Sequence, residues 1–147
     1  MFRSSSFHTI DPKGRIIIPA RFKDVINSSG GRKGVMVSNM DGSLYAYVFS
    51  EWMRIEKKIL SAKSRHMRQF KRFFLGNACE CIPDKQGRIL IPKTLREYAT
   101  LEKDIVLVGV LDHFEIWAKE RWNKENQTIE KNLGNDEVRA EIASLGL

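Results

Sequence analysis

The chain has 147 residues, a formal net charge of +7 and an isoelectric point of about 9.6. Hydrophobic residues make up 42% of it, which supports a packed core and excludes a chain that is disordered throughout. The positive charge favours a polyanionic partner, nucleic acid first and an anionic membrane surface second.

The first predicted element is a strand that leads into a tight turn at residues 11–14. Asp11, Pro12 and Gly14 occupy the first, second and fourth positions of this turn, as a type I turn favours. An aliphatic strand follows, beginning at Arg15. Strands that flank such a turn are expected to pair with each other as a hairpin.

A short helix is predicted after the second strand, because Pro19 suits the first turn of a helix. Phe22 and either Val25 or Ile26 would lie on one face of that helix. A strand at 34–37, an acidic turn at 40–42 and a strand at 44–48 are predicted next. Trp52 closes this part of the chain.

A basic helical stretch is predicted at residues 53–75, where apolar residues recur at intervals of three, four or seven. It carries eight Lys and Arg against a single acid, Glu56. A second surface for DNA and a solvated face that mediates contacts between subunits are both compatible with this pattern.

The turn and its flanks recur 73 residues further along the chain. Residues 81–92, CIPDKQGRILIP, match residues 8–19, HTIDPKGRIIIP, at the Asp, Gly, Arg, aliphatic and Pro positions. The later landmarks recur as well, at 104–108, 111–113, 114–117 and Trp122. Each copy is therefore expected to read strand, turn, strand, short helix, strand, turn, strand, helix.

A weaker helical tail closes the chain. Gly134 is expected to stop one helix and Asn135 to cap the next, whose apolar stripe is Val138, Ile142 and Leu145. The chain divides into a first repeat, connecting basic helices, a second repeat and a tail, at residues 5–52, 53–80, 81–124 and 125–147. A unit of about 50 residues buries too little surface to be stable alone, so the repeats are expected to share one core.

Neither a membrane segment nor a metal site is expected. The first seven residues lack a signal-peptide run, and no stretch approaches the roughly 18 apolar residues of a membrane span, so we expect a soluble, cytoplasmic protein. Cys79 and Cys81 are one residue apart, too close for an unstrained disulfide, and no second pair completes a zinc site. We expect two reduced thiols, and no metal, cofactor or small-molecule substrate.

Two Asp-x-x-x-Arg segments, each inside the same strand, turn, strand and Pro frame, resemble the MraZ family. The start Met1-Phe2-Arg3, and Phe73-Phe74 before Ala78-Cys79-Glu80, are similar to that family too, and the resemblance covers roughly residues 1–135. It implies an α+β fold with a β-barrel core: an AbrB-like swapped-hairpin, or double-split, β-barrel formed by two tandem pseudo-twofold repeats with peripheral helices.

The resemblance also implies a function. Members of the family are expected to form ring-shaped homo-oligomers that regulate transcription, here as a repressor at the nucleoid. The implied target is the promoter of the operon for cell division and cell-wall synthesis, which usually contains the family's own gene. Repetition of one contact around a ring raises avidity by about 10²–10⁴ and predicts direct-repeat boxes in double-stranded DNA.

The turns are the predicted DNA-binding elements, because a two-stranded ribbon fits the major groove of B-DNA. Arg15 and Arg88 can each bond two acceptors, on a guanine edge or on phosphate, but each could instead pair with its turn Asp and serve only the fold. Turn structure is expected of Asp11, Gly14, Asp84 and Gly87. The expected DNA-binding set is Arg15, Arg88, Lys13, Lys85, Arg3, Arg21 and Lys93.

Two other classes of function are weighed against DNA binding. Some AbrB-fold proteins are antitoxins whose disordered tails wrap a toxin, but residues 131–147 look helical and short. An enzyme would need a nucleophile motif, a phosphate loop or a cluster of metal ligands, and the sequence has none of these. We therefore predict a protein that is not an enzyme.

Overall fold

A computed structural model describes all 147 residues as an α+β protein. The first copy contains β1 (Ser5–Thr9), β2 (Arg15–Ile17), α1 (Ala20–Ser28), β3 (Val35–Met40), β4 (Ser43–Val48) and α2 (Phe49–Ser61), followed by α3 (Arg65–Phe74). The second contains β5 (Cys79–Cys81), β6 (Arg88–Leu90), α4 (Lys93–Ala99), β7 (Asp104–Gly109), β8 (Phe114–Ala118) and α5 (Lys119–Asn132), followed by α6 (Asp136–Ala143). The element order expected for each copy is confirmed.

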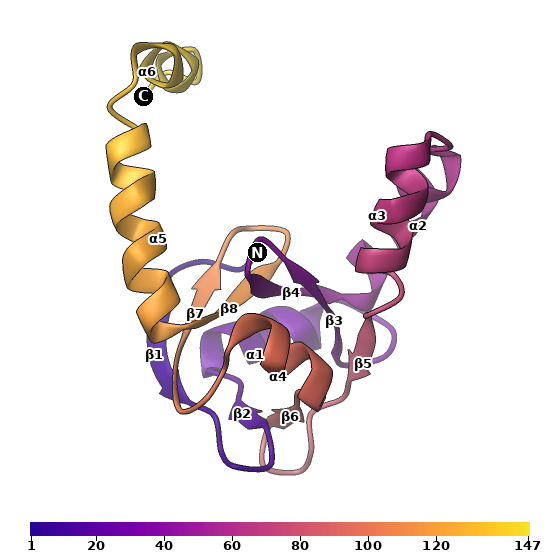
Figure 1. Cartoon of the computed structure of the whole chain (residues 1–147). Helices are drawn as coiled ribbons and strands as arrows, with labels where there is room; N and C mark the ends of the chain where they lie inside the picture. Colours follow the sequence, from indigo (N-terminus) through magenta and orange to yellow (C-terminus); the bar gives the residue numbers. More distant parts are fainter.

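The strands interleave the two copies (Figure 1). Six of them form an antiparallel sheet in the order β1-β7-β8-β4-β3-β5, and β2 pairs separately with β6. The strands β1, β3 and β4 of the first copy are equivalent to β5, β7 and β8 of the second. When each strand is replaced by its equivalent, the order of the sheet is simply reversed. A pseudo-twofold axis therefore passes between β4 and β8, where Tyr45 lies opposite Glu115, and between β2 and β6, where Ile16 lies opposite Ile89.

The prediction that the strands on either side of each turn pair with each other is wrong beyond the turn itself. Next to the first turn only Ile10 and Ile16 form a bridge, and the strands then separate. Strand β1 pairs with β7 of the other copy, as Phe7 opposite Val106 illustrates. The strands do not close into a hydrogen-bonded barrel, because β1 and β5 are the two edges of an open sheet.

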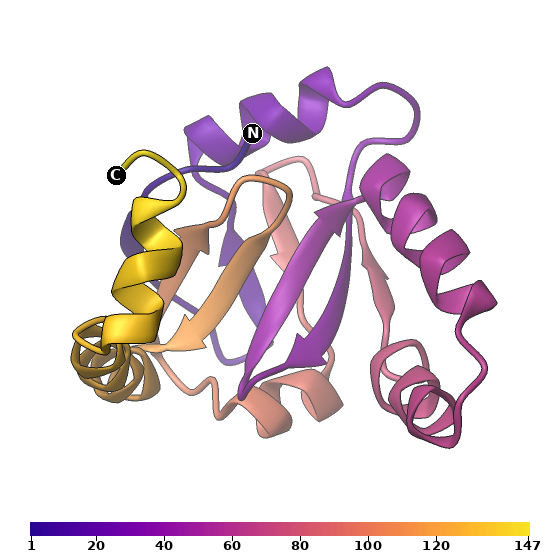
Figure 2. The same cartoon turned by 90° about the horizontal axis from the view of Figure 1, so that it is seen from above.

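The core lies between the inner face of the sheet, the β2–β6 ribbon and helices α1 and α4, which flank the sheet on opposite sides (Figure 2). The helices begin after Pro19 and Pro92, as expected. Phe22 and Ile26 of α1 are buried in the same 22-residue cluster as Leu95 of α4. Both copies therefore contribute to one core, as their small size requires.

Two helical arms rise from opposite ends of the sheet, on the side away from the ribbon (Figure 1). The α2–α3 arm packs through a second cluster made of Tyr47, Trp52, Ile59 and Phe74. By contrast, neither α5 nor α6 has a buried residue. The Asn135 cap of α6 is confirmed, since its side chain accepts from the Glu137 N–H. The expected limits after residues 52, 80 and 124 fall inside α2, β5 and α5.

Candidate nucleic-acid interface

The first Asp-x-x-x-Arg turn is organised by one carboxylate. Oδ1 of Asp11 accepts hydrogen bonds from the backbone N–H groups of Lys13 (3.0 Å) and Arg15 (2.9 Å). The Gly14 N–H closes the turn on the Asp11 carbonyl oxygen at 2.9 Å, with φ at +92°. The backbone hydrogen bond from Arg15 is the main cause that lowers the pKa of Asp11 below its ordinary value, so the carboxylate is charged at neutral pH.

The second turn repeats this arrangement. Oδ1 of Asp84 accepts from the N–H groups of Gln86 (2.9 Å) and Arg88 (3.0 Å), and Gly87 donates to the Asp84 carbonyl at 2.9 Å. The hydrogen bond from the Arg88 N–H again lowers the pKa of Asp84. The same geometry forms with Lys85 at the second position, so a Pro there is not required for it.

Each arginine is held by one nitrogen only. Nε of Arg15 donates to Oδ2 of Asp11 at 2.6 Å, and Nε of Arg88 donates to Oδ2 of Asp84 at 2.9 Å. Neither guanidinium makes any other hydrogen bond in the structure, so both terminal nitrogens of each fork are free. The side chains are 32% and 26% exposed. The Asp–Arg pair therefore orients the arginine and leaves its bidentate end available to a ligand.

The β2–β6 ribbon places the two turns side by side at one end of the molecule (Figure 1). Ile18 N–H donates to the Gly87 carbonyl at 3.0 Å, and Ile91 N–H donates to the Gly14 carbonyl at 2.8 Å. Each turn is thus bonded to the strand of the other copy. Lys13 and Lys85, both exposed, project from the same two turns.

The other three predicted DNA contacts are not part of the turns. Arg21 holds the N-terminal segment, because its guanidinium donates to the Arg3 carbonyl (3.1 Å) and to Oγ of Ser6 (2.8 Å). The N-terminus lies at the sheet, on the side away from the turns (Figure 1). Lys93, at the start of α4, is 3.9 Å from Glu97. Four of the seven predicted DNA-binding residues therefore lie in the two turns or at the start of the strands that follow them: Lys13, Arg15, Lys85 and Arg88.

Sequence reasoning missed two further cations beside the turns. A Cβ placed on Gly14 would lie 2.7 Å from Nε of Arg96, and one placed on Gly87 would lie 3.7 Å from Nζ of Lys23. Arg96 also donates from Nε to the Ile91 carbonyl at 3.1 Å. Their equivalent positions in the two copies could have revealed them, since Lys23 and Arg96 each follow the repeat's Pro by four residues. Each lies against the turn of the other copy.

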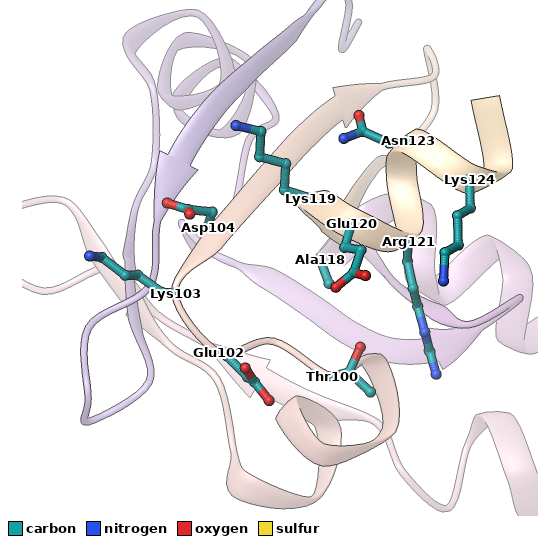
Figure 3. Close-up of a pocket in the computed structure, with 10 residues that line it drawn as sticks. All are labelled: Thr100, Glu102, Lys103, Asp104, Ala118, Lys119, Glu120, Arg121, Asn123 and Lys124. Atoms are coloured by element: carbon teal, nitrogen blue, oxygen red, sulfur yellow. The ribbon is translucent and has the colours of Figure 1, made fainter. Parts of the chain in front are cut away.

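The largest cleft is a poor candidate for a ligand site (Figure 3). It has a volume of about 580 Å³ and lies between the residues 100–104 and the start of α5. Acidic and basic side chains alternate around it, and the Lys119 and Arg121 side chains point away from each other (Figure 3). Small-molecule sites are usually apolar with a few convergent polar groups, which this cleft lacks.

The outer face of the sheet carries a histidine cluster beside the pseudo-twofold axis. His113 lies 2.6 Å from Asp112 through Nδ1 and 3.3 Å from Glu115 through Nε2, and it stacks against the rings of Tyr45 and Tyr47. Burial alone would lower the pKa of His113, but the hydrogen bonds to Glu115 and Asp112 outweigh it and raise the pKa. The cluster joins the β7–β8 turn to β4.

The two cysteines are free thiols, as expected. Burial, together with the neighbouring Cys79, raises the pKa of Cys81 to about 12, so that thiol is unreactive at neutral pH. The structure contains no group of three or more His, Cys, Asp or Glu side chains placed to hold a metal ion. None of its helices combines the length and apolar character needed to cross a membrane.

These features define a class: α+β proteins built from two fused copies of one unit, with paired Asp-x-x-x-Arg turns at one end. A family model described as "MraZ protein, putative antitoxin-like" matches residues 1–73 and, separately, residues 74–141. The chain therefore belongs to the MraZ family, as its sequence suggested.

Named relatives agree with this assignment. A protein of Desulforapulum autotrophicum named "Transcriptional regulator MraZ" is 70% identical over 147 residues, which is 100% of both chains. Proteins of the same name from Desulfosudis oleivorans and Clostridium beijerinckii are 48% and 44% identical over 149 residues, again across 100% of both chains.

Proposed function

We propose that this protein is a sequence-specific, DNA-binding transcriptional regulator that reads its operator with the two Asp-x-x-x-Arg turns. One observation carries the proposal: Arg15 and Arg88 lie on one ribbon, each held through Nε, with their terminal nitrogens free. Such a fork matches the O6 and N7 acceptors of guanine, and a two-stranded ribbon fits the major groove. The names of the relatives support regulation of transcription.

The surrounding cations supply the sequence-independent part of the affinity. Lys13 and Lys85 sit at the tips of the turns and would contact phosphate, with Lys23 and Arg96 behind them. Each neutralised phosphate releases condensed counterions, so affinity should fall steeply with salt. A bidentate arginine–guanine pair adds roughly 1–3 kcal/mol of discrimination between bases.

A single chain has only two DNA-binding turns and would bind weakly. The proposal therefore includes a ring-shaped homo-oligomer, which binds direct-repeat boxes through several turns at once and gains avidity. The α5 and α6 arm, in which no residue is buried within the chain, is available for contacts between subunits. The proposed target is the promoter of the division and cell-wall operon that contains the protein's own gene. There the protein would act as a repressor at the nucleoid, in the cytoplasm.

The test is binding to DNA from upstream of the protein's own operon, measured by gel shift or fluorescence anisotropy at fixed salt. Arg15→Ala and Arg88→Ala should each weaken binding by roughly 5- to 100-fold and lower the preference over unrelated DNA. Lys57→Ala, on the exposed face of α2, removes the same charge elsewhere and should leave the preference unchanged. If both arginine variants bind like the wild type, the turn mechanism is wrong.

An antitoxin-like binding module is the second candidate, because the family description itself uses that term. The residues after Gly134 form helix α6, whereas a wrapping tail would be extended. Affinity purification of the full chain from its own host tests this candidate. A stoichiometric toxin that is neutralised by the chain would favour it over transcriptional regulation.

A further inference from the structure

The outer face of the β2–β6 ribbon is a checkerboard of two arginines and two aliphatic side chains. In this ribbon Arg15 lies directly opposite Leu90, and Ile17 lies directly opposite Arg88. Alternate residues of a strand point to opposite faces. Since Ile16 and Ile89 point inward and are fully buried, the other four side chains share the outer face.

The two aliphatic side chains are strongly exposed. Ile17 is 59% and Leu90 is 56% exposed. A single exposed aliphatic residue is ordinary on a protein surface. Here, however, the exposed pair occupies pseudo-equivalent positions 73 residues apart, each directly opposite an arginine whose fork is free.

We propose that Ile17 and Leu90 are specificity-determining residues that contact the C5 methyl groups of thymine in the major groove. This inference rests on the proposed function of the turns. Among the base edges exposed in the major groove, the thymine methyl is the apolar group, and aliphatic side chains recognise it by contact. The ribbon would therefore read guanine with its arginines and thymine with its aliphatic side chains.

The distance between opposite side chains of the ribbon limits how far each thymine can lie from a guanine. Side chains directly opposite each other in an antiparallel pair have Cβ atoms about 4.5–5.5 Å apart. Successive base pairs are about 3.4 Å apart along the helix axis. Each thymine read by an aliphatic residue is therefore expected within a few base pairs of the guanine read by the arginine opposite it.

Uracil-substituted DNA gives a direct test, because uracil keeps the hydrogen-bonding groups of thymine and lacks only the methyl. The DNA from upstream of the operon is prepared once with thymine and once with uracil throughout. The wild-type protein should bind the uracil form more weakly, by about fourfold for each thymine methyl that it would otherwise touch. The Ile17→Ala/Leu90→Ala variant should bind thymine DNA more weakly than the wild type and distinguish the two DNAs by a ratio near one.

Val110→Ala is the matched control, since Val110 is 42% exposed in the β7–β8 turn, away from the ribbon. It should keep the wild-type ratio. Equal binding of thymine and uracil DNA by the wild type overturns the inference and leaves DNA binding by the turns intact. A thymine preference that survives in the double variant also overturns it. Failure to bind either DNA defeats the proposed function as well.

Discussion

Nε of Arg15 lies 2.6 Å from Oδ2 of Asp11, so a single nitrogen ties the guanidinium to the turn. Lysine carries its three donors on a single nitrogen, so it cannot hold the carboxylate and also present the planar pair of N–H groups that matches two acceptors at once. Arg15→Lys should therefore weaken operator binding by roughly 5- to 100-fold although the charge is kept. Fluorescence anisotropy measures the effect, with Arg54→Lys on α2 as the charge-conserving control. Unchanged affinity in Arg15→Lys would mean that charge alone matters here.

The two turn glycines should differ in their tolerance of a side chain. Both have positive φ, +92° at Gly14 and +74° at Gly87, and an alanine there costs about 1–2 kcal/mol. A Cβ at Gly14 would also lie 2.8 Å from the Ile91 carbonyl oxygen, whereas at Gly87 the nearest atom is 3.7 Å away. Gly14→Ala should therefore lose roughly 1–3 kcal/mol more than Gly87→Ala in urea unfolding. Equal losses of unfolding free energy would show that the backbone of the ribbon shifts at Gly14 to make room for the methyl group.

Adjacent isoleucines of β2 should behave differently. Ile16 is fully buried at the pseudo-twofold axis, and Ile17 is 59% exposed on the outer face. Ile16→Ala, or its counterpart Ile89→Ala, should lower the free energy of unfolding by about 2–5 kcal/mol. Ile17→Ala should change it by no more than about 0.5 kcal/mol. Chemical denaturation measures both, and a large loss at Ile17 would contradict the exposed position on which the thymine proposal depends.

Stability should depend on the charge of His113. Because its pKa is raised in the folded state, its contribution is complete below the unfolded pKa of about 6.5 and is lost as pH rises through the folded pKa. The difference in unfolding free energy between the wild type and His113→Gln should therefore shrink from pH 6 to pH 8. His8 acts in the opposite direction, since burial and Arg21 lower its pKa, so His8→Gln should show the reverse trend. A pH-independent difference at His113 would rule out a charged cluster.

The proposed ring can be tested on the α5 arm. Ile129 and Leu133 are one helical turn apart, 38% and 40% exposed, and α5 buries no residue. Ile129→Glu/Leu133→Glu should leave folding intact and reduce the mass measured by light scattering towards that of one chain. Gln127→Glu, an exposed polar position on the same helix, should not change the mass. Full-size assemblies from the double variant would place the subunit contacts elsewhere.

Local chemistry made much of the site predictable. The Asp11 and Asp84 turns follow from residues within four positions of each other, and the structure has them as predicted. The free ends of the arginines were not predictable. Sequence allowed either an Asp–Arg pair or a free arginine, and only the geometry shows that Nε makes the pair while the terminal nitrogens stay free.

The repeat in the sequence did not show which strands pair with each other. Two equivalent strands satisfy the same hydrophobic pattern whether each pairs within its own copy or with the other. The structure pairs β1 with β7, and β2 with β6, because this exchange buries Ile16 and Ile89 against each other and joins two small cores into one. Burial summed over the whole molecule selects that arrangement.

The exchange of strands also sets an order of events during synthesis. Ser5 has Val108 as its partner, so β1 leaves the ribosome long before the strand it pairs with exists. A nascent chain that ends before residue 104 already contains both Asp-x-x-x-Arg turns, yet β1 still lacks its partner strand β7. The native sheet can therefore assemble only when translation of the second copy is nearly finished.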